Sequence, residues 1–324
     1  MTTSSLALVP RLAVKDLLRI SDLSHDDLVH LLDEAARYRA HPFRATPLLT
    51  GDTVVCYFAK PSTRTRISFE TAIARLGGVP ISVSPTELQL GRGETIADTA
   101  RVLSRYSRAI VIRTFADSDV AELAAHAAVP VVNALTDGHH PCQALADMLT
   151  LRDRFDGTTG VRVAYLGDGN NVAHSLMEAC ALMGMHLTVA TPPGYEPDPD
   201  VVRVAEDLAA ANGSTIVLTH DPLEAAEDVH AVYTDVWVSM GDAPDEREAR
   251  LHAMRPYQVN SDLFARALPE AVFMHCLPAH RGEEVTAEVI DGPRSIVFEQ
   301  AENRLHTAEA VLSSLLLDEL EGSR

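Results

Sequence analysis

Residues 52–78, DTVVCYFAKPSTRTRISFETAIARLGG, place a predicted strand, a polar turn and a predicted helix in immediate succession. The apolar run at 52–59 predicts a buried strand, and the segment after Pro61 opens into a helix that ends at the glycine pair Gly77-Gly78. Strands and helices continue to alternate on both sides of this unit. Further strands are expected at 79–84, 109–113 and 129–135, and further helices at 25–40, 95–106 and 121–128. The alternation predicts an α/β protein built on a doubly wound parallel sheet.

A second series of the same kind begins after residue 155. A helix is predicted from His140 with Pro141 at its first position, and Gly157 and Gly160 then mark a boundary. Strands follow at 161–167, 186–191, 215–220, 231–238 and 271–278, with helices at 174–184 and 201–213 and a closing helix at 306–320. At 324 residues the chain suits two domains of about 150 residues each.

Composition excludes polyanionic partners. Lys and Arg total 27 against 46 Asp and Glu, which gives a formal charge of −19. Nucleic acids and acidic membranes are bound through basic patches, so neither is expected as a partner. A small anion can still bind in a locally basic pocket, because nearby groups decide the potential of a site.

Cysteine usage and the amino-terminal segment favour the cytoplasm. The four cysteines are scattered and form no C-x-x-C pair, as expected of reduced thiols and not of a zinc ribbon. The first twenty residues are somewhat rich in serine, as a presequence is, but the acidic residues Asp16 and Asp22 argue against one. No apolar run reaches the length of a membrane span.

The strongest local signal is the run Ser62-Thr63-Arg64-Thr65-Arg66, which lies between a predicted strand and a helix start. Free backbone N–H groups and the helix dipole point at that position, and hydroxyls and guanidiniums add further donors. These features predict a phosphate site. The other interpretation is a capping cluster with surface arginines, which a chain of such negative charge makes less attractive.

Two further polar motifs are ambiguous alone. A predicted helix starts with the motif His140-Pro141-Cys142-Gln143. A metal site formed by His139, His140 and Cys142 is disfavoured, because the side chains of adjacent residues diverge. No metal is therefore expected. Gly167-Asp168-Gly169-Asn170-Asn171 fails the dinucleotide pattern at Val172, so no nucleotide cofactor is expected. The asparagine amides of that turn are then expected to be free for a polar ligand.

Two strand ends in the second half could contact a substrate. Asp235 lies near the end of the strand at 231–238, and the polar stretch at 242–250 is either a solvated segment or a lid over a ligand. Cys276, in the motif His275-Cys276-Leu277-Pro278, is either a buried structural thiol or a reactive one that faces an amine.

Together these motifs resemble the transcarbamylase family over essentially the whole chain, and within it the ornithine-specific branch. The resemblance rests on STRTR at 62–66, HPCQ at 140–143, Asp235 with Ser239-Met240-Gly241, and HCLP at 275–278. It implies transfer of the carbamoyl group of carbamoyl phosphate to the side-chain amine of L-ornithine, giving citrulline and phosphate. The resemblance also implies two domains with the active site in the cleft between them. The carbamoyl-phosphate-binding domain would comprise residues 1–150 and a helix at about 305–324, and the ornithine-binding domain residues 151–304.

The resemblance also implies roles for single residues. Catalytic roles fall to Arg113, His140, Asp235 and Cys276, and ornithine binding to Asn171, Asp235, Ser239 and Met240. Gln89 matches a residue that reaches a neighbouring subunit's site, so a homotrimer or a multiple of trimers is implied. Carbamoyl-phosphate binding falls to Ser62, Thr63, Arg64, Thr65, Gln89, Arg113, His140, Pro141, Cys142, Gln143, Cys276, Leu277 and Arg304.

The implied chemistry is consistent with these residue types. Attack of an amine on the carbamoyl carbon builds negative charge on the carbonyl oxygen, which donors such as Arg113 and His140 would stabilise. Whether Cys276 takes a proton from the amine or only positions it stays open.

Two other functions are possible for a chain with these motifs: transfer to another amine acceptor, such as putrescine, N-acetylornithine or aspartate, and a non-catalytic ligand sensor on the same fold. Aspartate is the least favoured acceptor, because the Ser239-Met240-Gly241 and HCLP motifs both point away from it.

Overall fold

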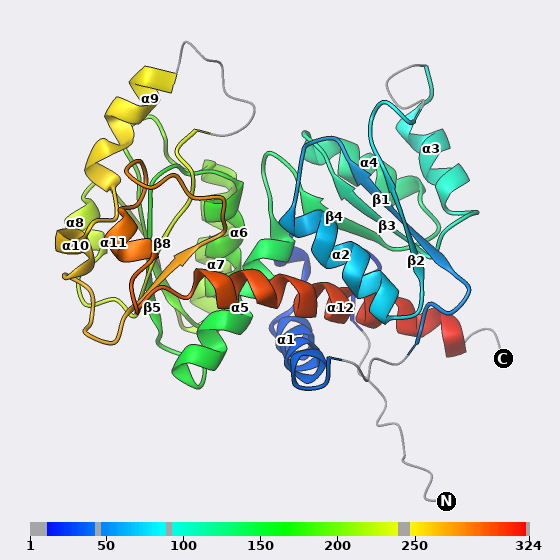
Figure 1. Ribbon diagram of the computed structural model, residues 1–324, viewed down its shortest axis with the longest axis horizontal. Helices are drawn as coiled ribbons and strands as arrows, with labels where there is room; N and C mark the ends of the chain where they lie inside the picture. Colours follow the sequence, from blue (N-terminus) through cyan, green and yellow to red (C-terminus); the bar gives the residue numbers. More distant parts are fainter. Residues whose placement is uncertain (1–11, 43–46, 89–92, 239–246, 322–324) are drawn as a thin grey trace, which may run out of the picture. The chain divides into compact units, whose positions relative to one another are not determined.

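The computed structural model describes residues 12–42, 47–88, 93–238 and 247–321 of the chain (Figure 1). These residues divide into two compact units. Unit 1 comprises Met1–Asp137 together with Arg304–Arg324, and unit 2 comprises Gly138–Asn303. Each unit is built on its own parallel sheet.

Unit 1 contains a four-stranded parallel sheet in the order β2-β1-β3-β4. Helix α2 packs beside β1 and β2, whereas α3 packs against α4 (Figure 1). The strands are β1 (Thr53–Phe58), β2 (Val79–Val83), β3 (Ala109–Arg113) and β4 (Val131–Leu135). The helices are η1 (Ile20–Asp22), α1 (His25–Ala40), α2 (Arg64–Arg75), α3 (Ile96–Leu103) and α4 (Asp117–His126), joined from Arg304 onward by the long helix α12 (Val297–Glu321).

Unit 2 contains a five-stranded parallel sheet in the order β7-β6-β5-β8-β9. Its strands are β5 (Arg162–Leu166), β6 (His186–Ala190), β7 (Ile216–Thr219), β8 (Ala231–Thr234) and β9 (Val272–His275). Its helices are α5 (Pro141–Phe155), α6 (Asn171–Leu182), α7 (Pro199–Asn212), α8 (Pro222–Ala225), α9 (Arg247–Met254), η2 (Arg255–Tyr257), α10 (Ser261–Phe264) and α11 (Ala287–Ile290). The predicted two-domain α/β fold with two parallel sheets is confirmed.

Several element bounds differ from the sequence prediction. Strand β8 ends at Thr234, so Asp235 lies beyond the strand and not inside it. Helix α6 begins at Asn171 and not at 174, because Asn170 provides an N-cap there. Helix α12 begins at Val297, nine residues before the predicted start, and the short helices α8, α10 and α11 were not predicted.

One glycine of unit 2 is required by packing. A Cβ atom on Gly169 would lie 2.3 Å from the backbone nitrogen of Pro197, far inside van der Waals contact. The Gly169 N–H also donates to the carbonyl oxygen of Tyr195 at 2.9 Å. Only glycine therefore lets the turn after β5 approach the loop before α7.

No helix within the described ranges is long and apolar enough to cross a membrane.

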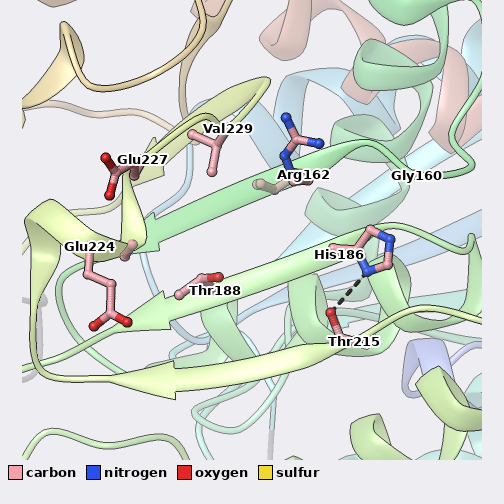
Figure 2. A pocket seen from close by; sticks show the side chains of 10 residues that line it. Gly160, Arg162, His186, Thr188, Thr215, Glu224, Glu227 and Val229 are labelled. Carbon is pink, nitrogen blue, oxygen red and sulfur yellow. Dashed lines mark hydrogen bonds between the residues drawn. The ribbon is translucent and has the colours of Figure 1, made fainter.

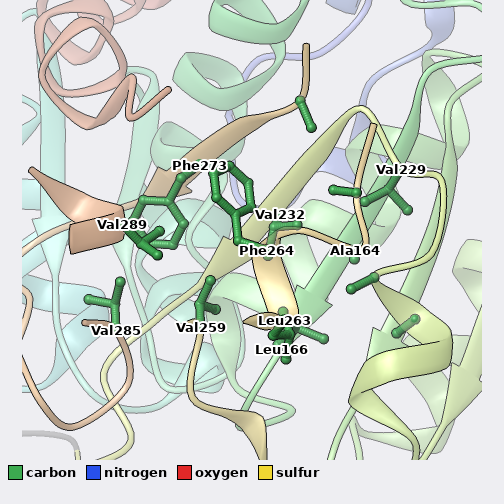
Figure 3. Close-up of a cluster of buried hydrophobic side chains, with 14 of the residues drawn as sticks. Ala164, Leu166, Val229, Val232, Val259, Leu263, Phe264, Phe273, Val285 and Val289 are labelled. Atoms are coloured by element: carbon green, nitrogen blue, oxygen red, sulfur yellow. The ribbon is translucent and has the colours of Figure 1, made fainter. Parts of the chain in front are cut away.

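A hydrophobic cluster covers one part of the unit 2 sheet (Figure 3). Phe273 of β9 is fully buried and meets the ring of Phe264 edge-on, with 6.3 Å between ring centroids. Val232 of β8 and Val289 of α11 belong to the same cluster. These side chains bury the strands that carry Asp235 and Cys276 at their ends.

We predict that Phe273→Ala lowers the free energy of unfolding of unit 2 by about 3–5 kcal/mol, because it removes a fully buried ring and leaves a cavity. Val217→Ala is the matched control, since this valine lies on edge strand β7 with 48% of its surface exposed. The control is expected to cost less than about 1 kcal/mol. Urea titration followed by circular dichroism measures both, and similar costs for the two variants would contradict the assignment of the core.

Candidate active site

The amino-terminus of α2 carries the predicted phosphate-binding residues of unit 1. Thr63 is the N-cap residue, and among the described residues its side chain finds no capping partner. The hydroxyl of Thr63 is therefore not used as a helix cap. Ser62 and Arg64 are half-buried beside it.

Thr65 and Arg304 form a buried pair at the same helix end. The Arg304 Nη2 donates a hydrogen bond to Thr65 Oγ1 at 3.0 Å, and the two residues are 4% and 2% exposed. Because an incoming N–H occupies one lone pair of the hydroxyl, the Thr65 proton is directed to a different acceptor. The hydroxyl is thus set up as a donor at the start of α2.

Arg66 has another role. Its Nε donates to Glu70 Oε1 at 2.8 Å, and Glu70 also accepts a hydrogen bond from Ser82 Oγ. Arg66 is exposed, and its partner Glu70 joins α2 to β2. The sequence predicts the guanidinium of Arg66 as a phosphate donor beside that of Arg64, and in the structure it is paired with Glu70.

Arg113 is the last residue of β3, where the β3–β4 register shifts between Ile112 and Arg113. It is 8% exposed, so its guanidinium lies in a largely buried setting at the carboxyl end of the sheet. Lys60 follows β1 at the same sheet edge; its ammonium pairs with Asp137 and lies 4.5 Å from the centroid of the Phe115 ring. Lys60 therefore connects the loops after β1, β3 and β4.

The amino-terminus of α5 carries the HPCQ motif, and helix α6 holds it in place. The backbone N–H of His140 donates to Ser175 Oγ at 2.8 Å, and His174 Nδ1 lies 2.8 Å from the carbonyl oxygen of Gly138. Pro141 occupies the first turn of α5, as predicted. His140, Pro141, Cys142 and Gln143 are all buried.

A buried polar network lies behind this motif. Gln143 Nε2 and Gln300 Nε2 both donate to Asp147 Oδ1, at 2.8 and 2.7 Å, and Asp147 is fully buried. Gln300 Oε1 accepts the backbone N–H of His275 at 2.9 Å. The network connects α5, α12 and β9 within unit 2 and fixes the amide of Gln143.

Asp235 and Cys276 meet at the ends of neighbouring strands β8 and β9. The Cys276 thiol donates to Asp235 Oδ1 at 2.8 Å, and Asn170 Nδ2 donates to Asp235 Oδ2 at 2.9 Å. Asp235 is 7% exposed, whereas Cys276 is half-buried. The prediction that the asparagine amides of the GDGNN turn are free is wrong for Asn170, because its amide caps α6 and holds Asp235.

The turn after β9 rests on a buried pair. His275 Nδ1 accepts the backbone N–H of Leu277 at 2.8 Å, and His275 Nε2 lies 3.3 Å from Glu284 Oε1. Both His275 and Glu284 are fully buried. Leu277 has a φ of +58°, a conformation that leucine rarely adopts, and it precedes a cis peptide bond to Pro278. The turn presents Cys276 toward Asp235.

Some of the predicted site residues are brought together and others are not described. Within unit 1 Thr65 contacts Arg304, and within unit 2 Asp235 contacts Cys276. Asn171 is the first residue of α6, next to Asn170. Gln89, Ser239 and Met240 lie outside the described residues.

Sequence reasoning missed three residues that shape the site: Asn170, Asp147 and Gln300. An asparagine just before a helix is a capping signal, which could have identified Asn170. The spacing of Gln143 and Asp147 places them one helical turn apart, which could have identified that pair. Gln300 lies 153 residues from Asp147 in the sequence, and no local pattern links the two.

Two groups of side chains place possible metal ligands close together in the described part of the chain: Asp235, His275 and Cys276, and His280, Glu283 and Glu284. In the first group, Asp235 Oδ1 accepts the Cys276 thiol and His275 Nδ1 accepts the Leu277 N–H. These internal hydrogen bonds account for the group by themselves. The sequence alternative of a metal site combined His139, His140 and Cys142. These three side chains do not form a group of close metal ligands in the structure.

A cavity of about 420 Å³ lies elsewhere in unit 2, over the face of β5 and β6 (Figure 2). Arg162, His186, Glu224 and Glu227 contribute to its lining, and His186 Nδ1 lies 2.9 Å from Thr215 Oγ1. None of the candidate residues that the structure describes lines this cavity. It is therefore separate from the polar clusters at the strand ends.

The chain is similar to known proteins over almost its whole length. The family model described as "aspartate/ornithine carbamoyltransferase, carbamoyl-P binding domain" matches residues 15–153, and the model described as "Asp/Orn binding domain" of the same enzymes matches residues 159–315. The ornithine carbamoyltransferase of Bacillus subtilis is 52% identical over 302 residues, covering 93% of this chain and 94% of its own. That of Methanothermobacter thermautotrophicus is 54% identical over 305 residues, covering 94% and 100%. The solved structure of the Pyrococcus furiosus ornithine carbamoyltransferase superposes with a TM-score of 0.90 at 51% identity, covering 94% of this chain and 97% of that one.

His174 provides a pH-dependent prediction for unit 2. Burial lowers the pKa of His174 below its ordinary 6.5, with nearby His139 acting in the same direction and the Gly138 carbonyl, Asp198 and Glu178 opposing it. The neutral ring accepts the Asp198 N–H at Nε2, a bond that protonation removes. Because the unfolded chain binds this proton more readily, stability is fully present above about pH 6.5 and falls as the pH drops toward the lowered pKa.

We therefore predict that His174→Asn, which cannot titrate, weakens the dependence of stability on pH between about 7.5 and 5.5. The variant keeps a donor for the Gly138 carbonyl and is less stable than the parent at pH 7.5. Melting temperatures across this pH range provide the measurement. Equal slopes for the two proteins would show that His174 does not carry the effect.

Proposed function

The chain belongs to the aspartate/ornithine carbamoyltransferase family, and from this premise we propose that it transfers the carbamoyl group of carbamoyl phosphate to the side-chain amine of L-ornithine, giving L-citrulline and phosphate. The observation that carries the proposal is the Asp235–Cys276 pair at the ends of β8 and β9. It places an acidic group and a thiol within residues 159–315, which match the Asp/Orn binding domain. We place the reaction in arginine biosynthesis, and the word "anabolic" in the name of the P. furiosus relative supports a biosynthetic role.

In this proposal the phosphate of carbamoyl phosphate binds at the amino-terminus of α2. Ser62, Thr63, Arg64 and Thr65 supply hydroxyl, guanidinium and backbone donors, and the helix dipole adds a positive field. These groups stabilise the charge that develops on phosphate as it leaves. Arg304 holds Thr65 Oγ1, so that the hydroxyl proton is directed to a ligand oxygen.

Arg113 and His140 are assigned to the carbonyl oxygen of the carbamoyl group, on which negative charge builds during attack. Gln143 is assigned to the carbamoyl amide, and its bond to Asp147 fixes the direction in which it acts. Pro141 and Cys142 form the first turn of α5 around these groups. Cys276 and Leu277 contribute from the turn after β9, where Leu277 adopts its unusual φ.

The amine acceptor is assigned to unit 2. A free alkylamine has a pKa of about 10, so it reacts only after losing a proton. Asp235 and Cys276 position this amine-bearing substrate, and Asn171 adds an amide at the start of α6. Ser239 and Met240 are assigned to ornithine by the same family pattern.

We also propose that the protein acts as a homotrimer or a multiple of trimers. In unit 1 the edge strand β2 exposes Val79 and Ile81, at 58% and 41%, and α2 exposes Ile67 at 56%. An apolar sheet edge in water is a site for association, so a second copy of the chain is the expected partner for this surface. Gln89, assigned to a neighbouring subunit's site, follows β2 closely in the sequence.

The cytoplasm is the proposed location, because none of the four cysteines forms a disulfide, as expected in a reducing compartment. Fractionation of the source cells followed by immunoblotting would test this.

The central prediction concerns the acceptor. With carbamoyl phosphate present, ornithine should give product at least about 100-fold faster than putrescine, N-acetylornithine or aspartate, because polar groups built for a free amino acid are left unpaired by the others.

Asp235→Asn should raise the KM for ornithine at least about 10-fold and change the KM for carbamoyl phosphate less than about 2-fold. Asp200→Asn, on an exposed face of α7, is the matched control.

Rates are measured by quantifying each carbamoylated product. Preference for another amine would overturn the acceptor assignment but keep the phosphate side, and no turnover with any amine would favour a ligand sensor.

The trimer prediction is tested by light scattering during gel filtration. The protein should elute with three times the 35.1 kDa mass of one chain, or a multiple of that mass. Val79→Asp with Ile81→Asp should reduce the mass toward one chain, because charges at the exposed edge of β2 oppose association. Val217→Asp on edge strand β7 of unit 2 is the control, and it should leave the mass unchanged. A protein that elutes as a single chain before any substitution would contradict the proposal.

A further inference from the structure

Asn170 makes hydrogen bonds on both sides of its amide. Its Oδ1 accepts the backbone N–H groups of Val172 and Ala173, at 2.9 and 3.2 Å, and the hydroxyl of Tyr165 at 3.2 Å. Its Nδ2 donates to Asp235 Oδ2 at 2.9 Å. One side chain therefore caps helix α6 and contacts the carboxylate assigned to the amine-bearing substrate.

The partners of Asn170 determine which way its amide points. A reversed amide would direct its NH2 group against two backbone N–H donors and its oxygen against the Asp235 carboxylate. Burial raises the pKa of Tyr165 well above its ordinary value, so that its hydroxyl keeps its proton and donates to Oδ1. The Nδ2 group must then face Asp235.

Asp235 is consequently held at both oxygens by different groups. Cys276 donates to Oδ1 and Asn170 donates to Oδ2, which together set the plane of the carboxylate. Strand β8 ends one residue earlier, so the ladder hydrogen bonds of the sheet do not orient this side chain. The rigid part of the arrangement is Asn170, because α6 anchors its oxygen.

We propose that Asn170 is a positioning residue for the acceptor substrate: it orients Asp235 so that this carboxylate meets the amino acid in one geometry. The inference rests on the proposed function. It assigns to Asn170 a role that its neighbour Asn171, matched to ornithine itself, does not fill. The capping bond alone would keep α6 folded without affecting the substrate.

Two substitutions separate the two roles. Asn170→Asp and Asn170→Ser both retain a good N-cap, but neither offers an NH2 donor to Asp235. If Asn170 positions Asp235, both variants raise the KM for ornithine at least about 10-fold, while the KM for carbamoyl phosphate changes less than about 2-fold. Asn260→Asp and Asn260→Ser are matched controls, since Asn260 caps α10 in the same unit through its bond to the Leu263 N–H.

The pH profile adds a test that a purely structural role would not alter. Asn170→Asp places a second carboxylate against Asp235, and two close carboxylates resist double ionisation. A proton shared by the pair restores a donor at position 170. The activity of Asn170→Asp relative to the parent should therefore rise at least about 3-fold from pH 8 to pH 6, whereas that of Asn170→Ser should not.

Alkylation of Cys276 by iodoacetamide provides a measurement without substrate or turnover. An Asp235 carboxylate that has lost its Asn170 donor can rotate away from the Cys276 thiol. The rate at which Cys276 is alkylated at pH 8 should therefore differ from that of the parent protein by at least about 3-fold in both Asn170 variants. Cys276→Ser gives the background from the three buried cysteines. The Asn260 variants should alkylate at the parental rate.

The outcomes separate the inference from the function on which it rests. A parent protein that makes no citrulline overturns the proposed function, and the alkylation rates still decide whether Asn170 orients Asp235. A parent that is active, with Asn170 variants that match the Asn260 variants in KM for ornithine and in alkylation rate, overturns the inference and leaves Asn170 as a helix cap only.

Discussion

Parallel strand pairing in unit 2 is the constraint on which the contact between Asp235 and Cys276 depends. The register pairs Leu166 of β5 with Thr234 of β8, and Thr234 with His275 of β9. Because parallel strands run in the same direction, the residues that follow these three leave the sheet at one edge. Asp235 and Cys276 are the next residues after paired positions, and their contact follows from the ladder. Sites at the carboxyl ends of strands are a general property of such sheets, and here the register decides which side chains meet.

Buried polar groups impose a second constraint, since each must find a partner inside the protein. Asp147 is fully buried and receives two amide donors, and Gln300 accepts the backbone of His275 in turn. The fully buried pair of His275 and Glu284 supports the turn that follows. Loss of any member leaves another without its partner in a low-dielectric setting, which makes such networks rigid and sensitive to substitution.

Much of this organisation could be predicted from the sequence, because the local patterns are strong. The apolar run before Ser62 and the pattern after it predicted the strand, turn and helix around the start of α2, and the second series of strands placed Asp235 and Cys276 toward the carboxyl ends of strands, although these strands end earlier than predicted. The bond between Asn170 and Asp235 could not be predicted, since it joins residues 65 positions apart through the fold of the sheet. The early start of α12 was missed for a related reason: the segment before residue 306 is polar in part, and Gln300 and Asn303 are buried there by bonds to α5. Family resemblance supplied the roles of single residues that spacing alone left open.

The Thr65–Arg304 contact has a consequence for biosynthesis. These residues are 239 positions apart, although both belong to unit 1. During translation the sheet of unit 1 is made first, the whole of unit 2 follows, and only then does Arg304 emerge from the ribosome. A nascent chain that has already formed the α2 helix therefore still lacks the guanidinium that orients Thr65. The end of α2 that carries Thr65 is therefore completed among the last steps of synthesis, only after the whole of unit 2 has been made.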